Sequence, residues 1–133
     1  MSKTNDPAIH IMRSQLGRAR GLGAAKSGVH HWWAQRLTAV ALLPLSLYFV
    51  LSVILLDHAT LAQVAAYLAQ PWNTVLFLCL IAAMFYHLLL GIQVVVEDYV
   101  HQDATRLVTM LIVRSVIIFC ALASAVSVLK LAF

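Results

Sequence analysis

The residues best suited to chemistry are a lone histidine and an Asp-Tyr pair within one long apolar segment. His87 stands eleven positions before Asp98, and Tyr99 follows directly. Along an α-helix, eleven residues return to nearly the same face and span about 16 Å. The hydrocarbon core of a bilayer is about 30 Å thick, so an Asp98 at one interface would place His87 near the midplane. An ionisable residue at that depth indicates a functional site, and neutral imidazole is the commonest metal ligand in proteins.

Two interpretations of His87 stay open on position alone, because a buried histidine can also simply hydrogen-bond a neighbouring helix. A six-coordinate haem needs two axial ligands, and the sequence has no second histidine at comparable depth. Haem at His87 therefore implies a partner subunit that supplies the other ligand, unless the iron is five-coordinate. At Asp98 and Tyr99, a phenol that donates to a carbonyl beside a carboxylate suits quinone binding and protonation.

The composition excludes a soluble globular domain. Of 133 residues, 62% are hydrophobic and only 11% are charged. Three apolar runs, at residues 37–56, 72–97 and 106–129, exceed the roughly 18 residues that indicate a membrane-spanning helix. We therefore predict an all-α integral membrane protein, in which residues 28–133 form one three-helix anchor domain after a polar, basic tail at residues 1–27. Three helices provide few walls, so a bulky cofactor would require a heteromeric helical bundle.

Basic residues are concentrated ahead of the first span. The chain has a net charge of +4, and six of its nine Lys and Arg residues precede residue 37, namely Lys3, Arg13, Arg18, Arg20, Lys26 and Arg36. The first loop has none, whereas the second has Arg106. Because Lys and Arg accumulate on the cytoplasmic side, we predict a cytoplasmic N-terminus and an external C-terminus, with Lys130 as the one contrary signal. This pattern explains the basic tail better than nucleic-acid binding does.

The first span has recognisable boundary residues. Trp32 and Trp33 fit the aromatic belt at a membrane interface. Arg36 can either extend to the headgroups or hold an anionic group just inside the membrane. Within the span, Pro44 is expected to kink the helix and to free a backbone carbonyl.

The third span contains a deep arginine and a face of small residues. Arg114 lies about two turns inside the helix and should either extend towards the cytoplasmic face or meet an acid. The small-residue face suits close helix packing, and its members are Ala121, Ser124, Ala125 and Val128. On the outer side of the membrane, the sequence offers only Asp57 and His58 as polar site residues.

Two motifs carry a resemblance to a known family. One is His87 with Asp98-Tyr99 in the second span, and the other is Gly28-Val29-His30 followed by Arg36-x-Thr38-Ala39 at the entry to the first. Together with the three spans, they resemble the small hydrophobic membrane-anchor subunit of succinate dehydrogenase (succinate:quinone oxidoreductase, complex II). The match runs from about residue 28 to residue 106.

The resemblance implies roles for five residues. His87 would be an axial ligand of a b-type haem that is shared with a larger, cytochrome b556-type anchor subunit. Tyr99 would donate a hydrogen bond to ubiquinone, with Asp98 beside it in the quinone pocket. His30 and Arg36 match family positions close to the haem propionates.

The resemblance also implies partners and a location. A flavoprotein subunit with FAD and an iron–sulphur subunit would dock on the cytoplasmic face, and electrons would pass from succinate through both to ubiquinone. The chain would not be catalytic alone. It would reside in a bacterial inner membrane, with the mitochondrial inner membrane as a second location.

Three alternatives are kept. The chain could anchor a quinol:fumarate reductase, in which electrons flow the other way, or it could be a haem-free structural anchor in which His87 only packs. A small proton-relay protein that uses His87, Asp98 and Arg114 is the third.

Overall fold

The computed structural model describes residues 24–133, with side chains from Gly28 onwards. The described residues fall into two units, one ending at Trp33 and the other formed by Ala34–Phe133. Most of the predicted N-terminal tail, at residues 1–23, lies outside the described part of the chain.

Four helices make up the described chain: α3 (Ala24–Leu55), α4 (Leu61–Leu68), α5 (Pro71–Tyr99) and α6 (Asp103–Ala132). Three of them contain segments long and apolar enough to cross a membrane, with mean hydropathies of 2.3, 2.5 and 2.3. The prediction of an all-α membrane protein with three spans is therefore confirmed.

The long helices extend beyond the predicted apolar runs. The first run begins at residue 37, whereas helix α3 already begins at Ala24. A hydropathy pattern finds only the part of a helix that can enter hydrocarbon, and polar residues continue the backbone hydrogen bonding outside it. Helix α5 starts with Pro71, which suits the first turn because no intrahelical partner is needed for its missing N–H. Helix α6 has Asp103 in its first turn and Lys130 in its last, as the helix dipole favours.

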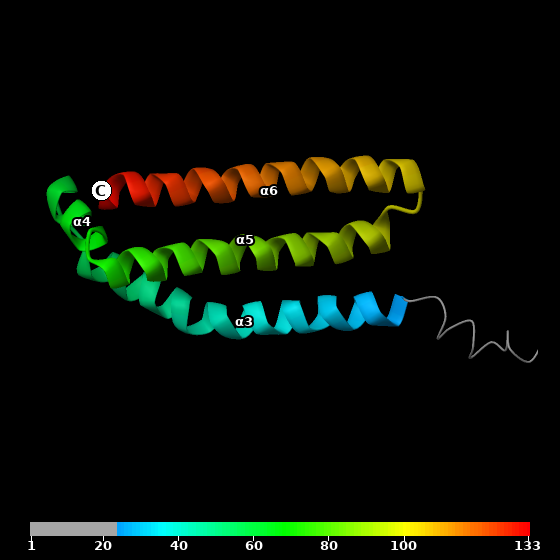
Figure 1. Ribbon diagram of the computed structural model, residues 1–133, viewed down its shortest axis with the longest axis horizontal. Helices are drawn as coiled ribbons and strands as arrows, with labels where there is room; N and C mark the ends of the chain where they lie inside the picture. Colours follow the sequence, from blue (N-terminus) through cyan, green and yellow to red (C-terminus); the bar gives the residue numbers. More distant parts are fainter. Residues whose placement is uncertain (1–23) are drawn as a thin grey trace, which may run out of the picture. The chain divides into compact units, whose positions relative to one another are not determined.

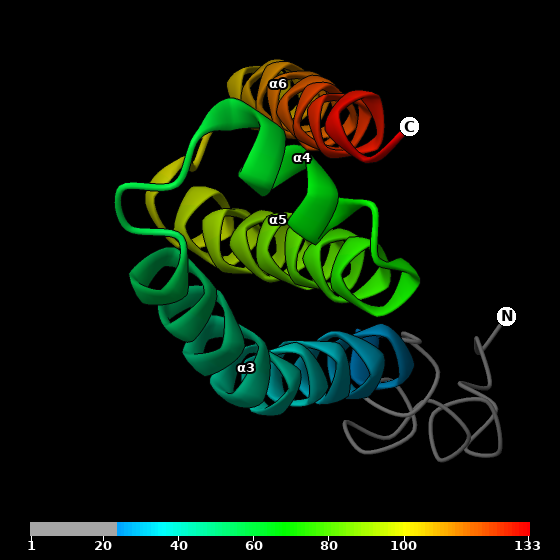
Figure 2. The same cartoon turned by 90° about the vertical axis from the view of Figure 1, so that its left-hand side faces the viewer.

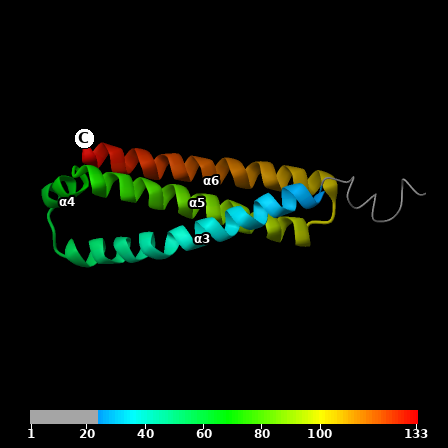
Figure 3. The ribbon, with the colours of Figure 1, turned by 60° about the horizontal axis from the view of Figure 1, so that its bottom comes forward.

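Within residues 34–133, α5 and α6 run antiparallel and side by side, joined by a short link at residues 100–102 (Figure 1). Helix α4 packs against the ends of both and lies near the C-terminus (Figures 1 and 2). Helix α3 continues through Pro44 and changes direction between its cyan and green parts (Figure 2), as expected for a proline inside a helix. In the view of Figure 3, the part of α3 that follows residue 34 runs at an angle to α5.

The chain buries few large apolar side chains. Among the described residues, the buried apolar positions are Leu68, Leu90, Val96, Ile117 and Ala132. By contrast, Phe119 on α6 is 73% exposed. The predicted small-residue face of α6 is half-buried at all four positions, whereas Leu122 and Val126 beside it are each 61% exposed. The surface that this leaves open is apolar enough to meet lipid or the helices of another subunit.

Helix α4 was not predicted, because it lies in the loop between the first two spans. Its N-terminus is a capping box: the Thr60 hydroxyl accepts from the Gln63 N–H, and the Thr60 N–H donates to Gln63 Oε1 at 2.8 Å. This pairing satisfies two backbone donors that a helix start otherwise leaves free. Before it, His58 adopts a positive φ of 64°, which lets the chain turn out of α3.

A polar cluster joins α3, α4 and α5 at this end of the unit. We call it the Tyr48 cluster, and its members are Tyr48, Ser52, Tyr67 and Asn73. The Tyr48 hydroxyl donates to Asn73 Oδ1 at 2.7 Å and lies 3.0 Å from the Tyr67 hydroxyl, which is 2.9 Å from Ser52 Oγ. Asn73 Nδ2 also donates to the Tyr67 carbonyl at 2.8 Å. From the sequence, only Asp57 and His58 were indicated as polar site residues at this end, and this structural cluster was not anticipated.

Candidate functional site

His87 lies near the middle of α5 and is half-buried. Its ring meets two side chains of α3, and we call these three residues the His87 site. Nδ1 of His87 lies 2.9 Å from the Thr38 hydroxyl oxygen. Nε2 lies 3.4 Å from the side-chain nitrogen of Gln35. Both ring nitrogens of His87 therefore face side chains of the same neighbouring helix, α3.

The two contacts differ in quality. A distance of 2.9 Å is typical of a good hydrogen bond, whereas 3.4 Å between Nε2 of His87 and Nε2 of Gln35 is long. The other amide atom, Gln35 Oε1, is buried and has no partner within the described residues. Gln35 is thus held loosely beside the histidine.

Gly91 lies one turn after His87 on α5. A Cβ atom added there would come within 3.8 Å of Gln35 Nε2. That distance is an ordinary van der Waals contact, so the Gln35 amide lies directly against the turn of α5 where Gly91 has no side chain.

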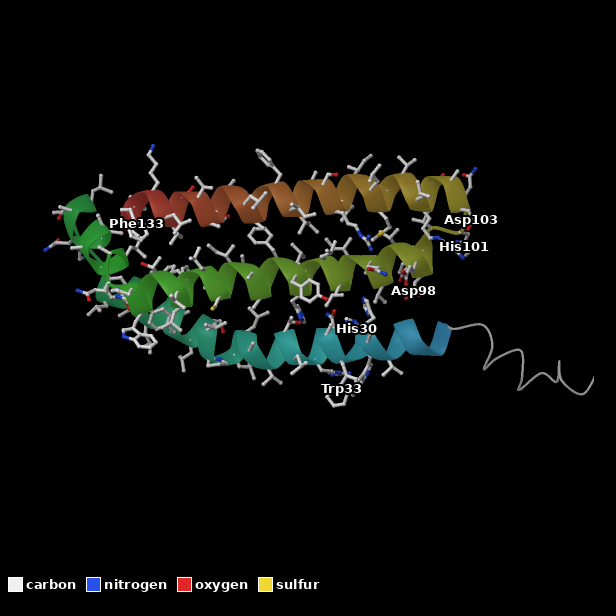
Figure 4. All side chains as sticks on the ribbon, in the orientation of Figure 1. His30, Trp33, Asp98, His101, Asp103 and Phe133 are labelled. Carbon is white, nitrogen blue, oxygen red and sulfur yellow. The ribbon has the colours of Figure 1, made fainter. Side chains whose placement is uncertain are left out.

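Asp98 and Tyr99 occupy the last turn of α5. Both side chains are exposed, and that of Tyr99 is 79% exposed. Figure 4 shows Asp98 beside His101 and Asp103, where α5 connects to α6, and Phe133 at the opposite end. Asp98 is about 16 Å from His87 along the helix axis, so the structure does not bring the predicted quinone residues to the predicted ligand.

His30 and Arg36 both lie on α3, and both side chains are exposed. Arg36 directly follows Gln35 of the His87 site. His30 belongs to the unit that ends at Trp33, where Trp32 and Trp33 pack edge to face with ring centroids 5.1 Å apart. The placement of the two tryptophans at a membrane interface stays a prediction.

A groove between α5 and α6 brings together polar residues that sequence reasoning left apart. Its volume is about 820 Å³, and it is lined by Gln93, Glu97, Asp103, Arg106, Leu107, Met110, Leu111 and Arg114. The guanidinium of Arg114 donates to Gln93 Oε1 at 3.4 Å, and Gln93 Nε2 donates to Glu97 at 2.8 Å. Arg106 pairs with Asp103 at 2.7 Å.

Arg114 thus meets an amide that connects it to an acid, rather than an acid directly. The spacing of Gln93 to Glu97 and of Asp103 to Arg106 could have indicated the pairs within each helix. Only the register between α5 and α6 brings Arg114 to Gln93, and one sequence does not specify that register.

The chain was compared with known proteins. Residues 10–123 match the family model described as succinate dehydrogenase/fumarate reductase transmembrane subunit. A succinate dehydrogenase hydrophobic membrane anchor subunit of Rickettsia bellii is 34% identical over 94 residues, covering 71% of this chain and 75% of the relative. A succinate dehydrogenase membrane anchor subunit of Reclinomonas americana is 32% identical, covering 70% and 80%.

A third relative is the succinate dehydrogenase hydrophobic membrane anchor subunit of Paracoccus denitrificans. It is 31% identical over 88 residues, covering 66% of this chain and 67% of the relative. No solved structure matches the chain.

Proposed function

The chain belongs to the succinate dehydrogenase/fumarate reductase transmembrane subunit family, and from this premise we propose that it helps to form a haem and a quinone site. In this proposal it anchors a flavoprotein and an iron–sulphur subunit to the membrane. The direction is succinate oxidation rather than fumarate reduction, because each relative named above is a succinate dehydrogenase subunit.

The haem proposal rests on the contacts that side chains of α3 make with the His87 ring. Nδ1 lies at good hydrogen-bonding distance from a hydroxyl, while Nε2 faces only the loosely held amide of Gln35. A metal-bound histidine in proteins almost always donates its other ring N–H to an oxygen. This histidine has that oxygen in place, and the nitrogen left over points to a side chain that can be displaced.

The surroundings of His87 also fit a haem. The unpartnered Gln35 Oε1 means that moving this amide breaks no good hydrogen bond, and Gly91 keeps the neighbouring turn of α5 free of a side chain. Among residues 24–133, no group of three His, Cys, Asp or Glu side chains gathers. Because the sequence has no second histidine at comparable depth, the proposal takes one ligand, His87, from this chain and the second from a cytochrome b556-type partner subunit.

A bound b-type haem would supply one-electron redox chemistry at this position. The residues of this chain have separate tasks. His87 would hold the iron through Nε2, and α3 would keep the imidazole in place. His30 and Arg36, as donors in the first half of α3, are proposed to bind the propionates, because Arg presents several N–H groups to a carboxylate.

For the quinone site, the proposal uses Tyr99 and Asp98. The 79% exposure of Tyr99 supports it, since a phenol that its own chain leaves open can donate to a ligand held against a partner subunit. Donation from the Tyr99 O–H to a quinone carbonyl would stabilise negative charge that develops on the oxygen during reduction. Asp98 is proposed to support this proton donation from the same turn.

We place the chain in a bacterial inner membrane, with the mitochondrial counterpart as the second location, and with the N-terminus on the cytoplasmic side. The support is the charge pattern: six Lys or Arg residues precede the first span and none lies in the first loop. A reporter fused after Phe133 should then read as external and one inserted at His101 as cytoplasmic. The reverse readings would move the quinone site away from the soluble subunits and contradict the proposal.

The proposal is tested by replacing His87 in the complete complex. His87→Ala should remove the low-spin haem spectrum of the purified complex, because a haem without this axial ligand cannot stay six-coordinate. Leu88→Ala, at an exposed neighbouring position of α5, serves as the control and should keep the spectrum. An unchanged spectrum in His87→Ala would show that the chain is a haem-free anchor or that another residue is the ligand.

A further inference from the structure

We propose that Thr38 is a positioning residue that fixes the tautomer and the rotation of the His87 ring. The inference rests on the proposed function, in which His87 is a haem ligand. It concerns a residue of α3 that does not itself reach the iron. Its role would be to hold the proton of the imidazole on Nδ1 and so keep the lone pair on Nε2.

The first step is to assign the Thr38 hydrogen. The Thr38 hydroxyl donates to backbone carbonyls of its own helix, with Oγ1 at 2.8 Å from the Ala34 oxygen and 3.1 Å from the Gln35 oxygen. A threonine hydroxyl has one hydrogen and two acceptor lone pairs. With that hydrogen directed to the helix carbonyls, Oγ1 can meet His87 only as an acceptor.

The second step follows for the histidine. Nδ1 of His87 lies 2.9 Å from Oγ1, so it must carry the proton that Oγ1 accepts. A neutral imidazole has one N–H, and Nε2 therefore has the free lone pair. The α3 backbone thus specifies the ring tautomer through one hydroxyl, and Nε2 is the nitrogen that can bind a metal.

The third step concerns geometry. Thr38 is β-branched, and its χ1 angle is restricted in a helix, while the back-bond to Ala34 fixes it further. An acceptor held this firmly limits rotation of the His87 ring about its Cβ–Cγ bond. The same hydrogen bond makes the ring more electron-rich and hence a stronger donor to iron.

Gln35 completes the arrangement. Its side-chain nitrogen lies 3.4 Å from Nε2 of His87, the nitrogen that would bind the metal. Its N–H can donate to the Nε2 lone pair, which agrees with the tautomer that Thr38 imposes. Because Gln35 Oε1 has no partner among the described residues, the amide gives up little when it moves aside.

The test compares Thr38→Val with Thr38→Ser in the assembled complex. Valine has nearly the shape of threonine but cannot accept the Nδ1 proton, whereas serine keeps the hydroxyl. In Thr38→Val we expect haem affinity to fall about 10–100-fold, as for other partners of metal-bound histidines. The midpoint potential of the haem should become more positive, because a weaker donor stabilises ferric iron less. Thr38→Ser should keep both values near those of the parent.

Two further variants make the result decisive. Ser46→Ala removes another α3 hydroxyl, which bonds only the Leu43 carbonyl, and it should leave the haem unchanged. His87→Ala tests the proposed function itself. If His87→Ala loses the haem while Thr38→Val keeps the parental affinity, potential and ferric electron paramagnetic resonance spectrum, the role of Thr38 is overturned and the haem ligand stands. If Thr38→Val does not assemble, Thr38→Ser decides: an altered potential there, with Ser46→Ala normal, likewise overturns the role of the hydroxyl.

Discussion

The Tyr48 cluster and the His87 site both connect α3 to α5, but they complete their hydrogen bonds differently. In the Tyr48 cluster, hydroxyls and an amide meet one another at 2.7–3.0 Å, and Ser52 is only 3% exposed. At the His87 site, one contact is long and Gln35 Oε1 has no partner in the described chain.

This difference separates two uses of polar residues in a membrane protein. A polar group that is shielded from water must be paired, because hydrocarbon offers no replacement partner. The Tyr48 cluster is paired within the chain and therefore stabilises the arrangement of α3, α4 and α5. The His87 site is only partly paired, which is what a position prepared for a cofactor requires.

The largest loss of stability is expected from Asn73→Leu, which disrupts the Tyr48 cluster. The substitution removes the Asn73 amide donor from the Tyr67 carbonyl, which keeps only the longer bond from the Gln70 N–H at 3.3 Å. It also deprives the Tyr48 hydroxyl of its shortest acceptor. Lost hydrogen bonds of this kind cost about 0.5–1.5 kcal/mol each, so the thermal unfolding midpoint of the purified complex should fall clearly. Ser124→Ala, which removes a hydroxyl that bonds only the Cys120 carbonyl, is the control. Equal midpoints for the two variants would mean that the cluster does not stabilise the chain.

A smaller effect is expected from Tyr99→Phe, which tests an exposed polar group. The ring and its packing remain, but the donor is lost. A hydrogen bond of about 0.5–1.5 kcal/mol corresponds to a several-fold loss of quinone reductase activity, and more if charge develops on the quinone oxygen. Succinate oxidation with a soluble dye that accepts electrons upstream should stay near the parental rate.

Tyr86→Phe provides a matched control, because this tyrosine of α5 is also exposed, at 44%, and lies outside the proposed quinone pair. Parental quinone reduction in Tyr99→Phe would identify Tyr99 as an interfacial aromatic residue without a role in quinone chemistry. Equal losses in the quinone and dye assays would indicate a defect in the assembly of the complex instead.

The smallest effect is expected from Gln35→Leu, the counterpart of Asn73→Leu at the His87 site. It removes an unpartnered buried acceptor, which stabilises the fold, together with one long contact, which destabilises it. The two changes in the free energy of unfolding therefore nearly cancel. The thermal midpoint of the haem-depleted complex should change little or rise slightly. A destabilisation as large as that of Asn73→Leu would show that the His87 site is as fully paired as the Tyr48 cluster.

The sequence was sufficient for the three spans because each is a long, nearly uncharged segment, and hydrophobicity alone decides entry into a bilayer. The sequence also indicates His87 as a candidate, since an ionisable residue deep in such a segment is rare, and its role as a ligand stays a prediction. Helix α4 was missed although Thr60 and Gln63 have the spacing of a capping box. The hydropathy pattern predicted a loop here, although the spacing of Thr60 and Gln63 already indicated the start of a helix.

Contacts between helices could not be predicted in this way. The pairing of Thr38 with His87, and that of Arg114 with Gln93, depends on how far one helix is shifted and rotated against another. Small residues such as Ala121 and Ala125 indicate that a helix face packs closely, but they do not specify its partner. The proposed roles of Tyr99 and Asp98 depend further on a surface that another subunit would provide.

The small number of buried apolar residues has a consequence for biogenesis. Each span is hydrophobic enough to enter a bilayer by itself, and the described chain gains little from burying one span against another. Insertion and assembly are therefore separable events: the ribosome can deliver the three helices one after another before their mutual arrangement is settled. A copy that finds no neighbouring subunit would keep its apolar faces turned to lipid. In that state it would be recognisable to the proteases that remove orphan membrane subunits.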